Sequence, residues 1–552
     1  MTPAPATPVL SIRGLTVRAE RDGQPGQTLV DDVSFDLAPG QVIGLIGESG
    51  AGKSTIGLAA LGYSRPGCVI TAGSVLYKGG DIVHMTERER QLLRGADIAY
   101  VAQSAGASFN PAHRLLQQVC EIPIARGLAA PAKARENAIG LFQSLDLPEP
   151  QRFGGYFPHQ VSGGQLQRAM AAMAMAASPA IVVFDEPTTA LDVTTQVEVL
   201  AAFRRLIQSH GTAAIYIAHD LAVVAQLADR IMVLRHGKMV EYGDTRDILE
   251  RPRQPYTQKL VRERTRKFAA APGAERDERL LTLRNVSASY KSFRNVVHDI
   301  DLDVDRSDTF AIVGESGSGK STLARVIVGM LPRQSGMLEL AGETLPASFK
   351  ERTREQLRRI QLIYQMPDIA LNPHQTVYET IARPIQFYFN PPKDEVRAQA
   401  EELLRQIELP LEFMTRKTSM LSGGQKQRLC IARALAAKPD VMICDEATSA
   451  LDPLVAEEIL ELLRRLQTTH RMGLVFISHD LGVVRRFCNK VIVMKRGAIV
   501  DGGAIEKVFA PPLHEYTALL MSSVPQMRPG WLDETLRARS QKQTDAIAQS
   551  AA

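Results

Sequence analysis

The chain has 552 residues, 45% of them hydrophobic and 23% charged, and its formal net charge is +5. This length exceeds what one hydrophobic core supports, so we expect more than one domain. The balance of 65 Lys and Arg against 60 Asp and Glu is no nucleic-acid signature. It fits a solvated mixed-charge surface, with contact to anionic lipid or a membrane partner as the alternative.

The sequence predicts neither an export signal nor a membrane-spanning segment. The opening stretch MTPAPATPVL has no basic segment before an apolar one, and no run of about 18 apolar residues occurs. If the protein works at a membrane, other chains must supply the channel. The five cysteines are scattered without CxxC spacing, which predicts reduced core thiols in a cytosolic protein.

One set of motifs occurs twice in the same order. The matching lysines are 267 residues apart (320 − 53), and the matching SGGQ serines are 260 apart (422 − 162). A nearly constant offset indicates duplication of a whole fold. We expect a first domain at 1–262, a linker at 263–279, a second domain at 280–530 and a polar tail at 531–552 that forms a frayed helix or is disordered.

The first motif in each copy is a glycine-rich loop between a predicted buried strand and a helix. The strands are expected at 42–46 and 310–313, and the loops read GESGAGKST at 47–55 and GESGSGKST at 314–322. In this pattern backbone N–H groups cradle phosphates, the lysine reaches the outer phosphates, and the serine after it ligates Mg²⁺. The predicted nucleotide-binding residues are Gly47, Ser49, Gly50, Gly52, Lys53, Ser54 and Thr55, and Gly314, Ser316, Gly317, Gly319, Lys320, Ser321 and Thr322.

An SGGQ segment follows in each copy, directly before a predicted helix rich in Arg and Ala. Serine and glycine at a helix start can form a second anion-binding nest, although a plain helix cap explains a single SGGQ equally well. Two copies, each about 20 residues before an Asp-Glu pair, favour the binding interpretation. The residues concerned are Ser162, Gly163, Gly164 and Gln165, and Ser422, Gly423, Gly424 and Gln425.

Each copy then has an apolar strand that ends in two carboxylates, IVVFDE at 181–186 and VMICDE at 441–446. Adjacent residues on a strand point to opposite faces, so the two carboxylates divide the work. We expect Asp185 and Asp445 to hold Mg²⁺, mostly through water, and Glu186 and Glu446 to polarise the attacking water. Without the glycine-rich loop before it, an apolar strand ending in Asp-Glu would more simply be a solvent-exposed strand end with no catalytic role.

These motifs together resemble the nucleotide-binding domains of ABC ATPases, over nearly the whole chain. The resemblance implies two tandem P-loop NTPase domains of α/β class, each with a RecA-like core, an antiparallel β part and a helical signature subdomain. It matches Gln103 and Gln365 to the Q-loop that contacts nucleotide and Mg²⁺, and 190–192 and 450–452 to the D-loop. His219 and His479 match the catalytic switch histidine, a position where a lone histidine would otherwise be read as structural.

The family also implies head-to-tail pairing of the two domains. One ATP would lie between Lys53 and Ser422, and the other between Lys320 and Ser162. Because an opposing nest of N–H groups contacts the γ-phosphate only while it is present, binding would close the pair and hydrolysis would open it.

Further local sequences are similar to the ATP-binding subunits of oligopeptide, dipeptide and nickel importers. These are SFNP at 108–111 and ALNP at 370–373, HDLAVV and HDLGVV after the switch histidines, and QPYT at 254–257 and HEYT at 514–517. The resemblance implies ATP-driven import at the cytoplasmic face of the inner membrane, through two membrane permeases fed by an extracytoplasmic substrate-binding protein. Peptides, glutathione, opines and nickel remain open as cargo. The alternatives are a ribosome-acting twin ATPase, which would carry a long charged linker, and a DNA-repair ATPase, which would carry zinc-ligand cysteine clusters.

Three positions depart from the family pattern. Where the family places an aromatic residue to stack on adenine, the second copy has Tyr290 and the first has Ala19, which predicts weaker nucleotide binding at the Lys53 site. The alternatives are that Arg18 lies over the base instead, or that the register of the first copy differs by one or two residues. Ala447 replaces the proline found at Pro187, with little expected effect on catalysis. Within its own half of the chain, neither the QPYT nor the HEYT element is followed by a cysteine, so we predict no iron-sulfur cluster.

Overall fold

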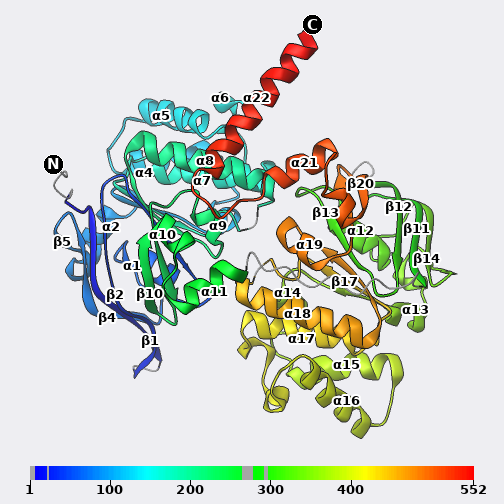
Figure 1. The fold of residues 1–552 in the computed structure, drawn as a ribbon. Helices are drawn as coiled ribbons and strands as arrows, with labels where there is room; N and C mark the ends of the chain where they lie inside the picture. The colour runs from blue at the N-terminus through cyan, green and yellow to red at the C-terminus, as the bar shows by residue number, and fades with distance from the viewer. Residues whose placement is uncertain are drawn as a thin grey trace. The chain divides into compact units, whose positions relative to one another are not determined.

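The computed structural model describes residues 7–21, 24–189, 191–263, 278–290, 296–449 and 451–551. The chain divides into two compact units (Figure 1), unit 1 with Met1–Glu263 and Pro525–Ala552, and unit 2 with Arg264–Val524. The tail therefore belongs to the first unit. Most of the expected linker, at 264–277, lies outside the described residues, as do positions 190 and 450 of the predicted D-loops.

Unit 1 contains a four-stranded antiparallel sheet in the order β2-β1-β4-β5 and a six-stranded sheet in the order β10-β9-β3-β8-β7-β6. In the second sheet only β10 runs antiparallel to its neighbour. The strands are β1 Leu10–Arg21, β2 Gln24–Leu37, β3 Val42–Gly47, β4 Cys68–Tyr77, β5 Gly80–Asp81, β6 Ile98–Val101, β7 Ile181–Asp185, β8 Ala213–Ile217, β9 Arg230–Arg235 and β10 Lys238–Asp244.

The helices of unit 1 supply the crossovers that parallel strands require. A group of helices, α3 to α7, is inserted between β6 and β7 and forms the helical part of the unit. The helices are α1 Lys53–Ala59, α2 Glu87–Leu93, α3 Ala105–Ser108, α4 Leu115–Ala125, α5 Pro131–Ser144, α6 Pro150–Phe153, α7 Gly163–Met175, α8 Val193–His210, α9 Leu221–Val224, α10 Thr245–Glu250, α11 Pro255–Glu263 and, from the end of the chain, α22 Trp531–Ala551.

Unit 2 repeats this topology, with sheets ordered β12-β11-β14-β15 and β16-β17-β18-β13-β19-β20. Its strands are β11 Arg279–Ala288, β12 Val297–Asp305, β13 Thr309–Val313, β14 Ser335–Leu340, β15 Glu343–Thr344, β16 Ile360–Ile363, β17 Val441–Asp445, β18 Gly473–Ile477, β19 Lys490–Lys495 and β20 Ala498–Ala504. Its helices are α12 Lys320–Ile327, α13 Arg354–Arg359, α14 Pro367–Ala370, α15 Val377–Phe389, α16 Lys393–Gln406, α17 Gly423–Leu435, α18 Pro453–His470, α19 Leu481–Phe487, α20 Ile505–Val508 and α21 Glu515–Ser522.

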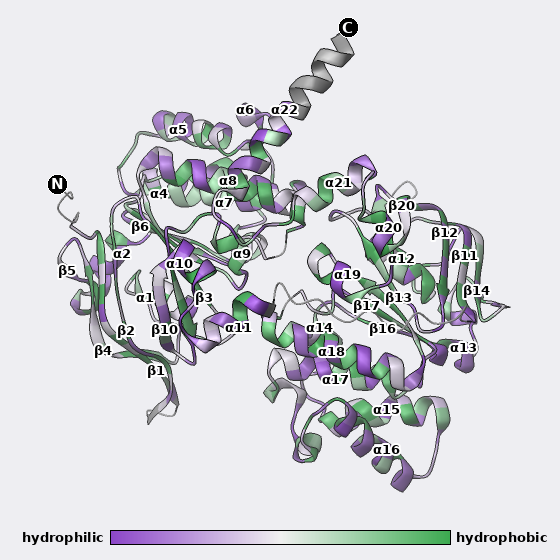
Figure 2. Cartoon of the chain, viewed as in Figure 1, coloured by the Kyte–Doolittle hydropathy of each residue, from purple (hydrophilic) through white to green (hydrophobic). Residues whose placement is uncertain are grey.

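The central strands are buried on both faces, so they are continuous apolar runs and not alternating ones. Every residue of β3, β7, β8, β13 and β18 is buried. Figure 2 accordingly colours β13 and β17 mainly as hydrophobic, while α16 carries mixed colours. Because β3 and β7 are parallel strands of one sheet, the loop after β3 and the carboxylates at the end of β7 meet at the same edge, and the same holds for β13 and β17.

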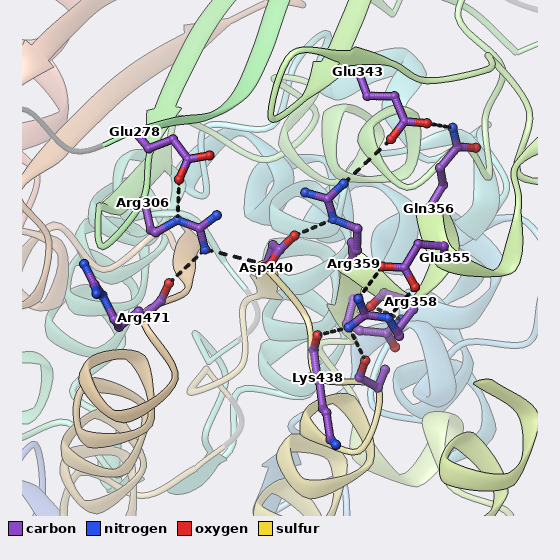
Figure 3. A network of polar contacts seen from close by, with 12 residues as sticks. Glu278, Arg306, Glu343, Glu355, Gln356, Arg358, Arg359, Lys438, Asp440 and Arg471 are labelled. Carbon is purple, nitrogen blue, oxygen red and sulfur yellow. Dashed lines mark hydrogen bonds and ion pairs between the residues drawn. The ribbon is translucent and has the colours of Figure 1, made fainter. Parts of the chain in front are cut away.

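An ionic network lies at the opposite, amino end of β17 in unit 2. Figure 3 shows Asp440 between Arg359, whose Nε donates to the carboxylate at 2.5 Å, and Arg306, at 3.8 Å. Arg306 also pairs with Glu278 at 3.2 Å, and Arg359 with Glu343 at 3.7 Å. Unit 1 has Ala180 directly before β7, where unit 2 has Asp440 before β17.

No helix within the described residues is long and apolar enough to cross a bilayer. All five cysteines are free thiols, and four of them are buried, Cys68 being the partly exposed one. Burial raises the pKa of the Cys430 thiol to about 11, which keeps it protonated near neutral pH.

Candidate nucleotide-binding sites

The phosphate loop of unit 1 joins β3 to α1. Gly52, the residue before the helix, has φ 93°, and a Cβ there would lie 2.6 Å from the carbonyl oxygen of Leu29, so both conformation and space require glycine. Lys53 Nζ lies in the loop and donates to the carbonyls of Gly47 at 2.7 Å and Glu48 at 2.9 Å. The loop and the first turn of α1 hold the other predicted residues, Ser49, Gly50, Ser54 and Thr55.

Unit 2 builds the same loop between β13 and α12. Gly319 has φ 106°. Lys320 Nζ donates to the carbonyls of Gly314 and Glu315, at 2.8 Å in both cases. The remaining predicted residues are in the same loop and first turn, namely Ser316, Gly317, Ser321 and Thr322. The two loops thus hold an ammonium group in the same place relative to their backbones.

A hydroxyl and a carboxylate from distant parts of the sequence meet in each unit. Ser54 Oγ donates to Asp185 Oδ1 at 2.8 Å, and Ser321 Oγ donates to Asp445 Oδ1 at 3.0 Å. Mg²⁺ is commonly held by one or two such protein oxygens together with substrate phosphates and water. The Ser–Asp pair of each unit supplies two such oxygens, so the residues present fit Mg²⁺ held together with a phosphate ligand. No group of three or more His, Cys, Asp or Glu that could hold a metal ion by itself occurs in the described ranges.

The two aspartates have different surroundings. Tyr100, on β6, donates its hydroxyl to the second oxygen of Asp185 at 2.5 Å. The matching position on β16 is Leu362, because Ile98 faces Ile181 in unit 1 as Ile360 faces Val441 in unit 2. Burial raises the pKa of Asp445, and the hydrogen bond from Ser321 opposes that effect only in part. The sequence analysis did not predict that Tyr100 contacts Asp185. The one feature that could have suggested this contact is the position of Tyr100 on β6, three residues before Gln103.

Three side chains of unit 1, two of them predicted from the sequence, converge on one carboxylate oxygen. Gln103 Nε2 donates to Glu186 Oε2 at 3.3 Å, and His219 Nδ1 lies 3.3 Å from the same atom. Thr189 Oγ1 also donates to it, at 3.2 Å. Burial alone would raise the pKa of Glu186, but the hydrogen bond and charge of His219, with the charge of Lys53, lower it overall.

Unit 2 repeats this cluster. Gln365 Nε2 donates to Glu446 Oε2 at 2.7 Å, and His479 Nδ1 lies 3.5 Å from that oxygen. Burial would lower the pKa of His479, but the hydrogen bond with Glu446 outweighs burial and raises it. Both glutamates have left-handed backbones, with φ 49° at Glu186 and 50° at Glu446, a conformation that costs energy for a non-glycine residue and that the sequence did not predict.

The SGGQ serines cap helices. Ser162 Oγ accepts from the Gln165 N–H at 3.3 Å, while Gln165 Oε1 accepts from the Ser162 N–H at 2.9 Å. The same reciprocal pair joins Ser422 and Gln425, at 3.4 and 2.9 Å. The cap that the sequence left open is therefore present in both units. Ser162, Gly163, Ser422 and Gly423 are exposed.

The second glycine of each SGGQ segment has a packing role. A Cβ on Gly164 would lie 2.2 Å from Thr195 Cγ2, and one on Gly424 would lie 2.6 Å from Val455 Cγ1. Because glycine has no Cβ, α7 can approach α8, and α17 can approach α18, at these two positions. Asp192 and Asp452, the described aspartates of the predicted D-loops, cap α8 and α18 through the backbone N–H groups at 195 and 455.

Strand pairing aligns Ala19 with Tyr290. Val17 pairs with Val30 in unit 1 as Ala288 pairs with Val297 in unit 2, so the residues two positions further on correspond. Tyr290 follows the end of β11, and its hydroxyl accepts from Arg325 Nη1 at 2.9 Å. Ala19 instead lies inside the longer strand β1, opposite Cys68.

Two protein-family models match the chain. The ABC transporter model matches residues 30–189 and 297–449. The model of the oligopeptide/dipeptide transporter C-terminal region matches residues 240–275 and 500–550. Both models therefore match twice, once in each half of the sequence.

Curated relatives match over almost the full chain. The peptidoglycan transport ATP-binding protein YejF of Agrobacterium fabrum is 35% identical over 529 residues, covering 94% of this chain and 96% of the relative. The glutathione import ATP-binding protein GsiA of Escherichia coli K12 is 33% identical over 562 residues, covering 94% of this chain and 90% of the relative. Among solved structures, cbiO1 of Clostridium perfringens is 29% identical, covers 43% of this chain and 92% of its own, and has a TM-score of 0.40.

Each family model matches the chain twice, and the relatives match it over 94% of its length. Both findings agree with the duplicated topology and its two glycine-rich loops. The chain belongs to the ABC transporter family, as a fused, two-domain ATP-binding subunit of an importer of the oligopeptide/dipeptide type that hydrolyses ATP to power substrate import.

Proposed function

We propose that the chain binds two ATP molecules, each enclosed by the phosphate loop of one unit and the SGGQ segment of the other. One would lie between Lys53 and Ser422, and the other between Lys320 and Ser162. Two features support this pairing. The two serines and the glycine directly after each of them are exposed, and the backbone N–H groups of Gly163 and Gly423 stand at helix starts, where anions bind well.

Within each site the side chains have separate tasks. Lys53 and Lys320 bind the outer phosphates, and Ser54 with Asp185, or Ser321 with Asp445, would hold Mg²⁺. When bound, the ion offsets the negative charge of the phosphates. Glu186 and Glu446 accept a proton from the attacking water and orient it. Their lowered pKa values keep them ionised, and therefore able to accept that proton, at neutral pH.

The histidine and the glutamine next to each glutamate position it. His219 and Gln103 both contact Glu186 Oε2, so a shift of either side chain changes where the carboxylate points. Gln103 and Gln365 are followed by mostly exposed segments at 104–108 and 366–370, so a movement of either glutamine can be passed to a partner protein bound there. In unit 2 this segment exposes apolar side chains, with Met366 53% and Ile369 81% exposed. We propose these segments as the surfaces that contact the permeases.

The partners proposed are two membrane permeases and an extracytoplasmic substrate-binding protein, with the chain at the cytoplasmic face of the inner membrane. We further propose cargo that contains peptide bonds. The relatives named above are a peptidoglycan transport protein and a glutathione import protein, and the C-terminal region matches the oligopeptide/dipeptide model, which supports this class over nickel or opines. Neither relative is a ribosome-acting ATPase.

Reconstitution tests the proposal. The chain is placed in vesicles with its permeases and receptor, and ATP-dependent uptake of a labelled tripeptide, glutathione and Ni²⁺ is compared. We expect uptake of a peptide-bonded solute, lost in Glu186→Gln and retained in Glu136→Gln, a change to an exposed carboxylate on α5. Uptake of Ni²⁺ alone would overturn the cargo assignment. Turnover stimulated by ribosomes and not by permeases would overturn the transport role.

A further inference from the structure

The last part of the chain packs on unit 1 although it follows unit 2 in sequence. We call residues 525–541 the C-terminal strap. Its helix α22 begins beside α8 (Figure 1), where Arg204 Nη2 donates to Asp533 Oδ2 at 2.5 Å. Trp531 is 3% exposed and Leu532 is fully buried. The strap is therefore docked through an apolar anchor and not only through surface charges.

A single glutamine holds the strap by its backbone. Gln226, two residues past α9, is 5% exposed. Its Nε2 donates to the carbonyls of Gln526 at 2.8 Å and Arg528 at 3.2 Å, and its Oε1 accepts from the Leu532 N–H at 3.1 Å. One buried amide thus hydrogen-bonds both to backbone carbonyls before α22 and to a backbone N–H in the first turn of that helix.

The equivalent place in unit 2 is occupied by that unit's own side chains. Because α9 and α19 begin at Leu221 and Leu481, the residue matching Gln226 is Arg486. Arg486 Nη2 donates to Glu457 Oε1 at 2.6 Å, and both side chains are largely buried, with 13% and 10% exposed. In unit 1 the residue matching Glu457 is Val197, which is apolar and buried. The docking site is therefore specific to unit 1.

The chain passes between the units twice, at 263/264 and again at 524/525. We propose that the C-terminal strap is a second tether, which keeps the two ATPase units close while nucleotide is absent and so lowers the ATP concentration needed to bring them together. This inference rests on the nucleotide-dependent pairing proposed above. Its physical basis is effective concentration, because a second short connection confines each unit near the other and shortens the search for the paired state.

The anchor also lies close in sequence to the switch histidine. Asp220, directly after His219, caps α9 by accepting from the Ala222 N–H at 2.8 Å, and Ala222 O accepts from Gln226 Nε2 at 2.9 Å. The strap is thus fastened to the same short helix that follows the switch.

The test uses the full-length chain with Gln226→Leu, which keeps the side-chain size but removes the three hydrogen bonds to the strap. Gln143→Leu, an exposed glutamine on α5, is the matched control. Hydrogen exchange in the nucleotide-free chain reports docking. We expect exchange at Leu532 to rise at least about tenfold in Gln226→Leu, with the strands of unit 1 unchanged. Unchanged exchange at Leu532 would overturn the anchor.

The second readout is the ATP concentration that gives half-maximal turnover. We expect it to rise about threefold or more in Gln226→Leu, with the maximal rate retained, and a stop codon after Val524 to give the same change. A released strap with an unchanged half-maximal concentration would overturn the tether. Absence of turnover in the wild-type chain would instead overturn the proposed function, while the exchange result would still decide the anchor.

Discussion

The two units place the same groups at the proposed phosphate sites but surround these groups with different neighbours. Each has a loop lysine, a serine paired with an aspartate, and a glutamate contacted by a glutamine and a histidine. The neighbours differ. In unit 1 the hydroxyl of Tyr100 donates to Asp185, whereas unit 2 has Leu362 at the position that matches Tyr100. In unit 2 the hydroxyl of Tyr290 accepts from Arg325, whereas unit 1 has Ala19 at the position that matches Tyr290. Duplication has kept the reacting groups and let their supports diverge, so the two sites should share chemistry and differ in affinity.

The largest expected effect tests the shared chemistry. Glu186 and Glu446 each contact a glutamine and a histidine and share a left-handed backbone. Because the proposed pair opens only after hydrolysis, one inactive site should hold the pair closed, so Glu186→Gln and Glu446→Gln should each reduce ATP turnover by about a hundredfold or more. The measurement is steady-state phosphate release by the full chain with its permeases, with Glu136→Gln as the control. If one substitution leaves turnover unchanged, that site is catalytically silent and the two units are not equivalent.

The next effect tests the difference in affinity. With base stacking worth about 1–3 kcal/mol, the site that has Tyr290 should bind ATP about five- to a hundredfold more tightly than the site that has Ala19. Calorimetric titration of Lys53→Ala, which leaves the unit 2 site, and of Lys320→Ala, which leaves the unit 1 site, measures the two affinities. Tyr290→Ala should then remove the difference. Equal affinities before that change would refute the asymmetry.

A stability difference is expected at the amino end of the mixed sheets. Asp440 joins Arg359 and Arg306 in unit 2 (Figure 3), whereas unit 1 has Ala180 there. Asp440→Ala leaves two partly buried guanidinium groups without this partner, so we expect unit 2 to lose about 1–3 kcal/mol of unfolding free energy. Scanning calorimetry measures it, with Asp368→Ala, which breaks an exposed ion pair, as the control. Equal changes in both variants would mean that the network adds nothing.

The smallest effect concerns metal dependence. Tyr100 fixes the second oxygen of Asp185, so Tyr100→Phe should raise the Mg²⁺ concentration needed for nucleotide binding by unit 1 about two- to tenfold, the value of one hydrogen bond. The measurement is fluorescent nucleotide binding at varied Mg²⁺ in the Lys320→Ala background. Tyr63→Phe, at an exposed tyrosine, is the control. An unchanged Mg²⁺ dependence would assign Tyr100 a packing role only.

Local signals made much of this molecule predictable. The GxxxxGK[ST] loops, the apolar strands that end in Asp-Glu and the S-x-x-Q caps are each written within a few neighbouring residues, and their repetition gave the two-domain organisation. Contacts between distant segments were not predictable in this way. Tyr100 meets Asp185 only because β6 pairs with β7, and Gln226 meets the strap across 300 residues of sequence. The polar composition after Trp531 predicted a frayed helix or a disordered tail. It did not predict docking on unit 1, because only Trp531, Leu532 and Thr535 are buried among the side chains described at 531–541.

The central claim is that each unit completes the nucleotide site of the other. The most direct measurement is a structure of the Glu186→Gln, Glu446→Gln chain with Mg²⁺ and ATP bound. We predict the γ-phosphate held by Lys53 within hydrogen-bonding distance of Ser422, and the one held by Lys320 within that distance of Ser162. Two nucleotides bound entirely within single units, with both SGGQ serines far from any γ-phosphate, would contradict the account.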